Sequence, residues 1–269
     1  MIVDFHTHIF PDKIAKQTIA LLSAKGGIPP FADGSVDGLL HAMDDAEVNV
    51  SVTLPVLTNP NSFESVNRFA AQINKRFEHQ SKRLISFGAI HPSCENIDEK
   101  MKSLKERGFL GVKIHPDYQG AFITDNGYVR ILECAKEYDL IVVTHAGLDA
   151  AYPDTIHCPP TLAKEVIRKV RHSKFVLAHC GGYKMWDEVM DILCGEDVYL
   201  DTAYVLRFIG EETFKKLLAR HGEDRILFGT DSPWSDVKHD VEILRSFFLS
   251  NNTEQKLFSL NAKQLLELR

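Results

Sequence analysis

The sequence predicts a single (β/α)₈ barrel, because two features of the chain occur together. Eight short runs rich in Val, Ile, Leu and Phe occur at residues 2–5, 48–54, 84–90, 111–114, 140–144, 174–178, 198–200 and 226–229. They show little alternation of apolar and polar residues, which is typical of strands buried on both faces of a parallel sheet. Helix-like or loop segments separate them, and no linker or low-complexity stretch interrupts the 269 residues. We therefore expect one domain over residues 1–269.

The segments between these runs support the same fold. Val66, Phe69, Ala70, Ile73 and Phe77 follow helical spacing, and residues 159–161 (Pro-Pro-Thr) are typical of a helix start. The apolar residues of the tail, 257–268, predict one closing helix. Residues 23–33 and 147–160 predict long loops, which often carry substrate contacts. A doubly wound open sheet is the main alternative, but no Gly-x-Gly-x-x-Gly follows the first run.

Composition narrows the class of protein. The chain is 44% hydrophobic and 25% charged, with a formal net charge of -6 and no run of five like charges, which argues against nucleic acid as a partner. It has no stretch of eighteen apolar residues, so we expect no membrane span. Because the first run starts at residue 2, we expect no signal peptide. The five cysteines include no Cys-x-x-Cys pair, which indicates reduced thiols in a cytoplasmic protein.

The first strand ends in a His-x-His pattern. Side chains alternate along a strand, so His6 and His8 point the same way. Two imidazoles on one face make half of a metal site, whereas two polar loop residues after a strand would be the plain alternative.

Other predicted strands also end in polar residues. These ends read Lys113-Ile-His115-Pro-Asp117, Thr144-His145-Ala-Gly, Ala178-His179-Cys-Gly-Gly and Gly229-Thr-Asp231-Ser-Pro. In a barrel the carboxyl ends of all strands meet at one face, where the active sites of this fold lie. Several imidazoles and a carboxylate at that face favour a metal centre over scattered loop residues.

Barrel closure predicts which of these residues meet. The eighth strand lies beside the first, so Asp231 can approach His6 and His8, and His145 can complete the shell from across the narrow interior. Three imidazoles and a carboxylate suit Zn²⁺, with Mn²⁺ or Fe²⁺ as alternatives. Asp231 can also take a proton from water, and His179 can orient that water or stabilise charge on the substrate.

This pattern resembles the amidohydrolase superfamily over essentially the whole chain. The short motifs at the strand ends are most similar to those of the amidohydrolase-related branch that includes aminocarboxymuconate semialdehyde decarboxylase. The resemblance implies that His6, His8, His145 and Asp231 are metal ligands and that His179 is a catalytic residue beside them. A related family of metal-dependent deoxyribonucleases also starts with His-x-His, but its strand-four Glu is absent here.

Lys113 has two alternative roles. In two-metal members of the superfamily a strand-four lysine is carboxylated and bridges the ions, and Lys113 and His115 can both face the interior. A plain ammonium would instead bind a substrate carboxylate or phosphate. The decarboxylase-like members contain a single metal, so we expect one ion rather than two.

Two further residues are weaker candidates for the site. His157 follows the fifth strand and either lines the pocket or lies on a surface loop. Arg207 follows the seventh strand and either holds a substrate anion or forms a structural ion pair.

The sequence therefore predicts a metal-dependent hydrolase that uses a metal-activated water on a small amide, ester or lactone. The first alternative is a metal-dependent, non-oxidative decarboxylase of an unsaturated or aromatic carboxylic acid, which would use the same ligands. The second is a metal-containing binding protein without turnover, although spare acid–base groups are unusual in structural sites. We expect a small-molecule substrate and leave a homodimer open.

Overall fold

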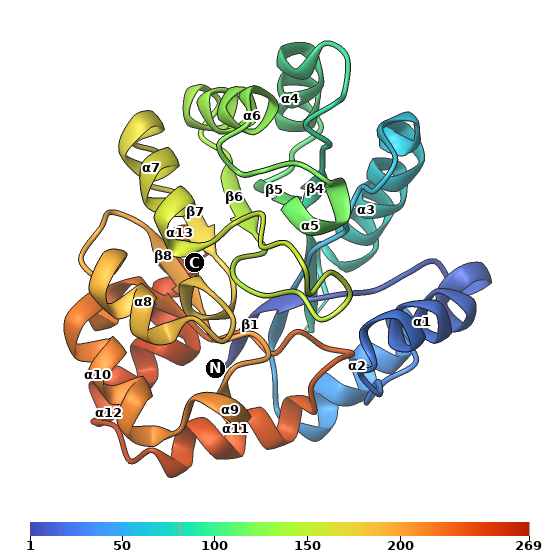
Figure 1. The fold of residues 1–269 in the computed structure, drawn as a ribbon. Coiled ribbons are helices and arrows are strands. Elements are labelled where there is room, and N and C mark those ends of the chain that lie inside the picture. Colours follow the sequence, from blue (N-terminus) through green and yellow to red (C-terminus); the bar gives the residue numbers. More distant parts are fainter. Residues whose placement is uncertain (81, 269) are drawn as a thin grey trace.

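A computed structural model describes residues 1–80 and 82–268, in which the strands form a central barrel ringed by helices (Figure 1). The strands are β1 (Val3–Thr7), β2 (Val50–Thr53), β3 (Arg83–Ser86), β4 (Gly88–Ala89), β5 (Gly111–Ile114), β6 (Ile141–Thr144), β7 (Phe175–Leu177), β8 (Tyr199–Asp201) and β9 (Ile226–Leu227). The (β/α)₈ barrel predicted from the sequence is confirmed.

All strand pairs are parallel, in the orders β1-β2-β3 and β4-β5-β6-β7-β8-β9. The β2 ladder continues past β3, because the Phe87 N–H donates to the Thr53 carbonyl at 3.0 Å. Thus β3 and β4 are two halves of the predicted strand 84–90. The barrel closes where the Phe5 N–H donates to the Phe228 carbonyl at 2.8 Å, which joins β1 to the segment after β9.

The helices surround this barrel. They are α1 (Asp12–Gly26), α2 (Val36–Asp45), α3 (Phe63–Phe77), α4 (Ile97–Glu106), α5 (Pro116–Gln119), α6 (Asn126–Glu137), α7 (Pro160–Val170), α8 (Trp186–Ile192), α9 (Leu206–Ile209), α10 (Glu211–His221), α11 (Val237–Ser246), α12 (Asn251–Gln255) and α13 (Asn261–Leu265). Short turns η1 (Pro60–Ser62), η2 (His179–Gly181) and η3 (Glu223–Arg225) and the π-helical η4 (Lys256–Leu260) complete the described elements. None of the helices within residues 1–80 and 82–268 is long and apolar enough to cross a lipid bilayer.

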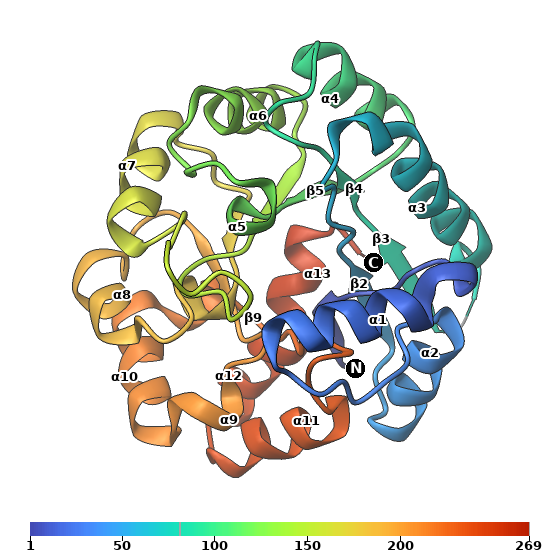
Figure 2. The same cartoon turned by 45° about the vertical axis from the view of Figure 1, so that its right-hand side comes forward.

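Two apolar cores hold these layers together. The larger packs the outward side chains of the strands against the helices, including Ala70, Ile73 and Phe77 of the predicted helical stripe. The smaller joins side chains such as Val3, Phe5 and Val143 with Leu265 and Leu266 at the end of the chain. Figure 2 shows α13 inside the ring of outer helices, so the predicted closing helix fills one end of the barrel.

A β-bulge in β1 sets the direction of the His-x-His pair. Between Asp4 and Thr7 the chain advances three residues, whereas its partner β2 advances only from Ser51 to Thr53. Because side chains alternate, one extra residue exchanges the two faces of the strand. Phe5 packs in the interior core before the bulge, and His6 points into the cavity after it.

Candidate metal centre and active-site cavity

The carboxyl ends of the strands open into a cavity of about 720 Å³. Its floor carries the polar residues of the strand ends, namely His6, His8, Lys113, His115, His145, His179 and Asp231. Its walls are largely apolar and aromatic, with Phe69, Tyr118, Tyr152, Tyr183, Tyr204 and Trp234 among them. Both segments predicted as long loops contribute wall residues, although residues 23–26 belong to α1.

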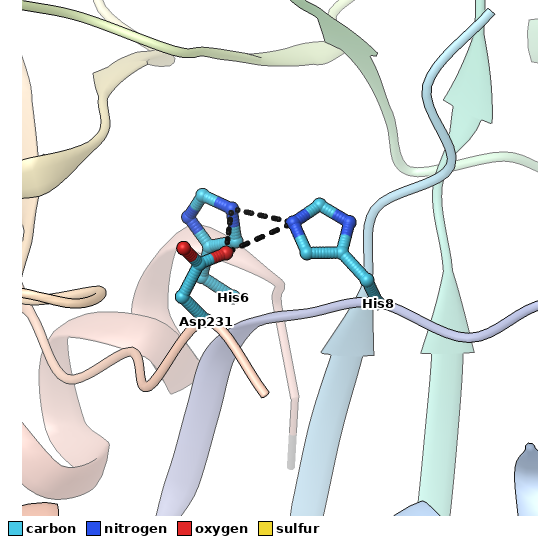
Figure 3. A group of neighbouring side chains, drawn as sticks. All are labelled: His6, His8 and Asp231. Atoms are coloured by element: carbon cyan, nitrogen blue, oxygen red, sulfur yellow. Dashed lines mark hydrogen bonds and ion pairs between the residues drawn. The ribbon is translucent and has the colours of Figure 1, made fainter. Parts of the chain in front are cut away.

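His6, His8 and Asp231 converge on one point of the floor (Figure 3). The Nε2 atoms of the two histidines lie 3.2 Å apart, and Asp231 Oδ1 lies 3.0 Å from His8 Nε2 and 3.4 Å from His6 Nε2. Asp231 is held beside β1 because its backbone N–H donates to the His6 carbonyl at 2.7 Å. The three side chains form a group whose ligand atoms all lie within 4.8 Å of one another.

The partners of the other ring nitrogens indicate which nitrogens carry hydrogen. His8 Nδ1 lies 2.8 Å from the Leu54 carbonyl, which can only accept, so His8 Nδ1 is the donor. His6 Nδ1 likewise donates to Asp201 Oδ2 at 2.8 Å. In the neutral rings both Nε2 atoms therefore present lone pairs, and they face each other and a carboxylate oxygen. Such a convergence of acceptors fits a divalent cation, which the lone pairs would bind.

Asp231 has the charge that this role requires. Burial on its own raises the pKa of this carboxyl, but when no metal ion takes the place of the imidazole protons, a hydrogen bond from His8 and the positive charge of His6 and His8 lower it to about 2. Asp231 is therefore a carboxylate at neutral pH.

Lys113 lies at the inner end of the cavity. Its Nζ is 3.1 Å from His6 Nε2, and the side chain is buried. Burial lowers the pKa of Lys113 to about 8, even though the carboxylates of Asp201 and Asp231 raise it. The residue is thus a buried cation next to the proposed metal ligands.

Asp201 links two parts of the site, although no sequence pattern indicated a role for this residue. Its Oδ2 accepts from His6, while its Oδ1 accepts from the backbone N–H groups of His179 and Ala203. Its place at the end of β8 was the only signal available.

His145 lies apart from the group of His6, His8 and Asp231. Its Nδ1 lies 2.9 Å from His179 Nε2, and His179 Nδ1 lies 2.8 Å from the Ala203 carbonyl. His145 instead belongs to a second group, with His115 and Asp149. Its assignment as fourth ligand of the first ion stays a prediction.

The backbone at position 147 has a conformation and a close contact that require glycine. It has a positive φ of 85°, and an added Cβ would come within 2.1 Å of the Tyr183 backbone nitrogen. The residue after His145-Ala146 therefore needs the freedom of glycine to pass so close to another segment.

Two remaining candidates lie outside the cavity lining. His157 is bound to Asp117, with His157 Nδ1 2.9 Å from Asp117 Oδ1. Arg207 donates to the Trp234 carbonyl and to Ser235 Oγ, and it packs over the ring of Tyr204. Both residues support the wall. Asp117, one of the polar residues at the predicted strand ends, and Asp149, which no sequence pattern indicated, instead face His145.

This architecture agrees with a family model. The model described as amidohydrolase matches residues 3–268. The chain belongs to the amidohydrolase family. No match was found among curated protein sequences.

Several solved structures share the barrel of this amidohydrolase. An uncharacterised TIM-barrel protein from Bordetella bronchiseptica has a TM-score of 0.77 at 16% identity, covering 99% of this chain and 98% of that one. The 2,6-dihydroxybenzoate decarboxylase from Rhizobium has a TM-score of 0.73 at 15% identity, covering 99% and 98%. A dihydroxybenzoic acid decarboxylase from Polaromonas, with bound manganese and the inhibitor 2-nitroresorcinol, has a TM-score of 0.74 at 17% identity, covering 99% and 97%. At these identities the likeness establishes the fold alone.

Proposed function

We propose that this amidohydrolase is a metal-dependent, non-oxidative decarboxylase of a small aromatic or unsaturated carboxylic acid. The observation that carries the proposal is that a candidate metal site and a buried lysine lie side by side at the floor of one largely apolar cavity. Three acceptor atoms of His6, His8 and Asp231 converge as a metal site would require, and the buried amine of Lys113 lies beside them. Together they form a receptor for a carboxylate group.

The walls favour a flat, apolar substrate. Tyr183, Tyr204 and Trp234 line one part of the cavity, and Phe69, Tyr118 and Tyr152 contribute further aromatic surface. An aromatic ring can bury its faces against such side chains. A carboxylate drawn into this environment loses hydration, and its charge, which desolvation penalises, is removed once CO₂ has left and the substrate carbon has gained a proton.

A bound divalent ion would supply Lewis-acid chemistry at the substrate oxygen atoms. Lys113 would hold the carboxylate, and the C–C bond to it would break with release of CO₂. The electron pair then remains on the substrate carbon, which must gain a proton. Asp231 is a carboxylate at rest, so it would first accept a proton from water or a substrate hydroxyl and then pass it to that carbon.

Comparisons support decarboxylation ahead of hydrolysis. Decarboxylases are among the proteins with the same fold, and one of them contains manganese. Their match covers nearly all of both chains. Zn²⁺ and Fe²⁺ also suit imidazole and carboxylate ligands, and we propose one ion at this group.

Hydrolysis of a small amide, ester or lactone is the second candidate. The same metal ligands support it, because a bound ion would lower the pKa of a water molecule and Asp231 could take the proton of that water. His179 would then orient the water or stabilise the charge that develops on the substrate. We further propose a cytoplasmic location, which the five free thiols favour.

The test compares two classes of substrate on one metal-loaded preparation. Protein reconstituted with Mn²⁺ or Zn²⁺ is incubated in D₂O with hydroxybenzoates and other unsaturated acids, and separately with amides, esters and lactones. CO₂ release together with deuterium at the vacated carbon, detected by NMR, supports decarboxylation. Cleavage of the carbonyl substrates without CO₂ would transfer the assignment to hydrolysis, and no turnover by loaded protein would favour a binding protein.

Two variants accompany this assay. Asp231→Asn removes the charge of a proposed ligand and proton carrier, so turnover should fall by about 10²-fold or more. Asp154→Asn changes an exposed carboxylate in the loop above the cavity and should leave turnover unchanged. Equal activity of both variants would exclude the proposed role of Asp231.

A further inference from the structure

One side of the cavity is apolar and nearly free of charge. It consists of the lining residues within 9–28, mostly from α1, and within 54–69, which run from the end of β2 into α3. Lys25, in the last turn of α1, is the one ionisable side chain among these described lining residues beyond His8. Its Nζ lies 3.7 Å from the ring centroid of Tyr152, which belongs to the loop after β6. We call this surface the apolar side.

One face of α1 is directed into the cavity. Five of its residues line the cavity, namely Ile14, Thr18, Leu21, Leu22 and Lys25. Their helical spacing places them on one face. Ala15 and Ile19, next to that face, are buried and anchor the helix. Ile14 and Leu21 are nevertheless 47% and 68% exposed, so α1 has an apolar face beyond the one that it uses for packing.

Residues 54–69 continue this surface. Val56, Val66 and Phe69 line the cavity and are only partly buried. Figure 1 shows α1 and α3 on the same side of the barrel. The polar lining residues here are uncharged hydroxyls, such as Thr58 and Ser65. Single exposed apolar residues are common on proteins, but a continuous apolar surface in a cavity usually marks a place where a ligand binds.

The apolar side begins at the candidate metal centre. β1 and β2 are paired in parallel, and just beyond them His8 Nδ1 donates to the Leu54 carbonyl at 2.8 Å. From this contact the chain after His8 leads to α1, and the chain after Leu54 leads to α3. A ligand with a carboxylate at the floor would therefore have its remaining atoms next to the apolar side.

The size of the cavity also favours a ligand with more than one ring of atoms. Its volume of about 720 Å³ lies within the range of about 300–1,000 Å³ that is typical of sites for drug-sized ligands. A single-ring acid bound at the floor would leave Ile14 and Leu21 in contact with water. An apolar substituent that covered them would gain free energy from burial.

We propose that the substrate is an acid with an extended apolar substituent, such as an alkyl or alkenyl chain, which binds along α1 and residues 54–69. This inference rests on the proposed function in one respect, because it takes the acid group to bind at the floor. Ile14 and Leu21 would then determine specificity, since they contact the substituent and not the reacting atoms.

The test measures binding as a function of chain length. Protein loaded with Zn²⁺ is titrated by calorimetry with 2-hydroxybenzoate and with its 4-alkyl and 5-alkyl homologues of two, four and six carbons. The Kd should fall by about two- to fourfold per methylene in at least one series, because a fully buried methylene contributes about 0.8 kcal/mol. A Kd that does not change with chain length in either series would overturn the proposal.

Ile14→Gln and Leu21→Gln locate the chain. Glutamine is a good helix former, and both positions are exposed, so the fold should persist, which thermal unfolding checks. Each variant should bind the six-carbon homologue at least about fivefold more weakly and the unsubstituted acid within about twofold of wild type. Leu260→Gln, at a position that is 45% exposed and outside the cavity lining, should change neither. An undiminished gain from the chain in both variants would contradict the proposed contact.

Two further readouts separate the competing explanations. Light scattering shows whether Leu21→Gln changes the oligomeric state, and dissociation of a wild-type dimer would assign this face to a second copy of the chain instead. CO₂ release is followed in the same mixtures. Chain-dependent binding without CO₂ would retain the apolar side and reject the decarboxylase, whereas CO₂ release without any gain from the chain would do the reverse. Failure of every acid to bind would overturn both.

Discussion

The imidazole of His6 is held from two directions at once. Asp201 accepts from its Nδ1, while its Nε2 faces His8, Asp231 and Lys113. Burial is the main cause of the lowered pKa of His6, and the charge of Lys113 adds to it. A neutral His6 with its hydrogen on Nδ1 is the form that can bind a metal ion.

Asp201→Asn should weaken metal binding without removing a ligand. An amide cannot hold His6 in the same orientation and charge state as the carboxylate does, so affinity for Zn²⁺ should fall by about 10–100-fold. Competition against a chromogenic chelator measures this change. Asp187→Asn, an exposed carboxylate on α8, is the control. Equal affinity of wild type and Asp201→Asn would show that this hydrogen bond is unimportant for binding.

Lys113→Met distinguishes the two roles considered for this residue. Methionine fills a similar buried space without charge, so a lysine that holds a substrate carboxylate should show a KM raised by about 10-fold or more, with metal content unchanged. A carboxylated, bridging lysine should instead lose metal on substitution. Elemental analysis and steady-state kinetics on the same preparation give both readouts.

At the scale of elements, α11 contains an ionisable group that opposes stability. Asp240 is buried near the start of this helix, and its Oδ2 has no hydrogen-bond partner within the described residues. Burial raises the pKa of Asp240 to about 7, although a bond from Ser235 and the charge of Arg207 lower it. Between about pH 4 and pH 7 the folded protein therefore binds a proton that the unfolded chain releases. Stability should fall as pH rises through this window.

Asp240→Asn removes the ionisable group and therefore this pH dependence of stability. The free energy of unfolding of the variant, relative to wild type, should increase as pH rises toward about 7 and then level off, by about 2–4 kcal/mol in total. Urea denaturation at several pH values from 5 to 8 measures the difference. Glu242→Gln, on the exposed side of α11, should show no such trend. A pH-independent difference for Asp240→Asn would contradict the raised pKa.

At the scale of the whole molecule, the C-terminal helix completes the barrel interior at the end opposite the cavity. Leu265 is 4% exposed and belongs to the interior core with residues of β1, β2 and β6. Residues separated by most of the chain thus share one core, and the same closure brings Asp231 beside His6 and His8.

Leu265→Ala should destabilise the fold while leaving the site intact. Truncating a buried leucine leaves a cavity and costs about 2–5 kcal/mol. Metal content of the folded protein should not change. Leu260→Ala, at a position that is 45% exposed, should change stability by less than about 0.5 kcal/mol. Thermal or urea unfolding tests the pair, and loss of metal in folded Leu265→Ala would contradict this separation of core and site.

The sequence by itself was sufficient for the strand order and for part of the site. Apolar runs at regular intervals predict buried parallel strands, and the structure has them to within two residues at each end. The proximity of Asp231 to the His-x-His pair also followed, because closing a barrel leaves few arrangements of its first and last strands. Their role as metal ligands remains a prediction.

Only the tertiary structure decided how the side chains are directed within that frame. The bulge that points His6 into the cavity depends on pairing between β1 and β2, which no local pattern of residues 3–7 reveals. The ring orientations of His6 and His145 depend on Asp201 and, through His179, on Ala203, which lie at the end of β8 and just beyond it. The periodicity of a strand is a local property that can be read along the chain. The orientation of the candidate metal ligands instead depends on contacts between segments that are distant in the sequence.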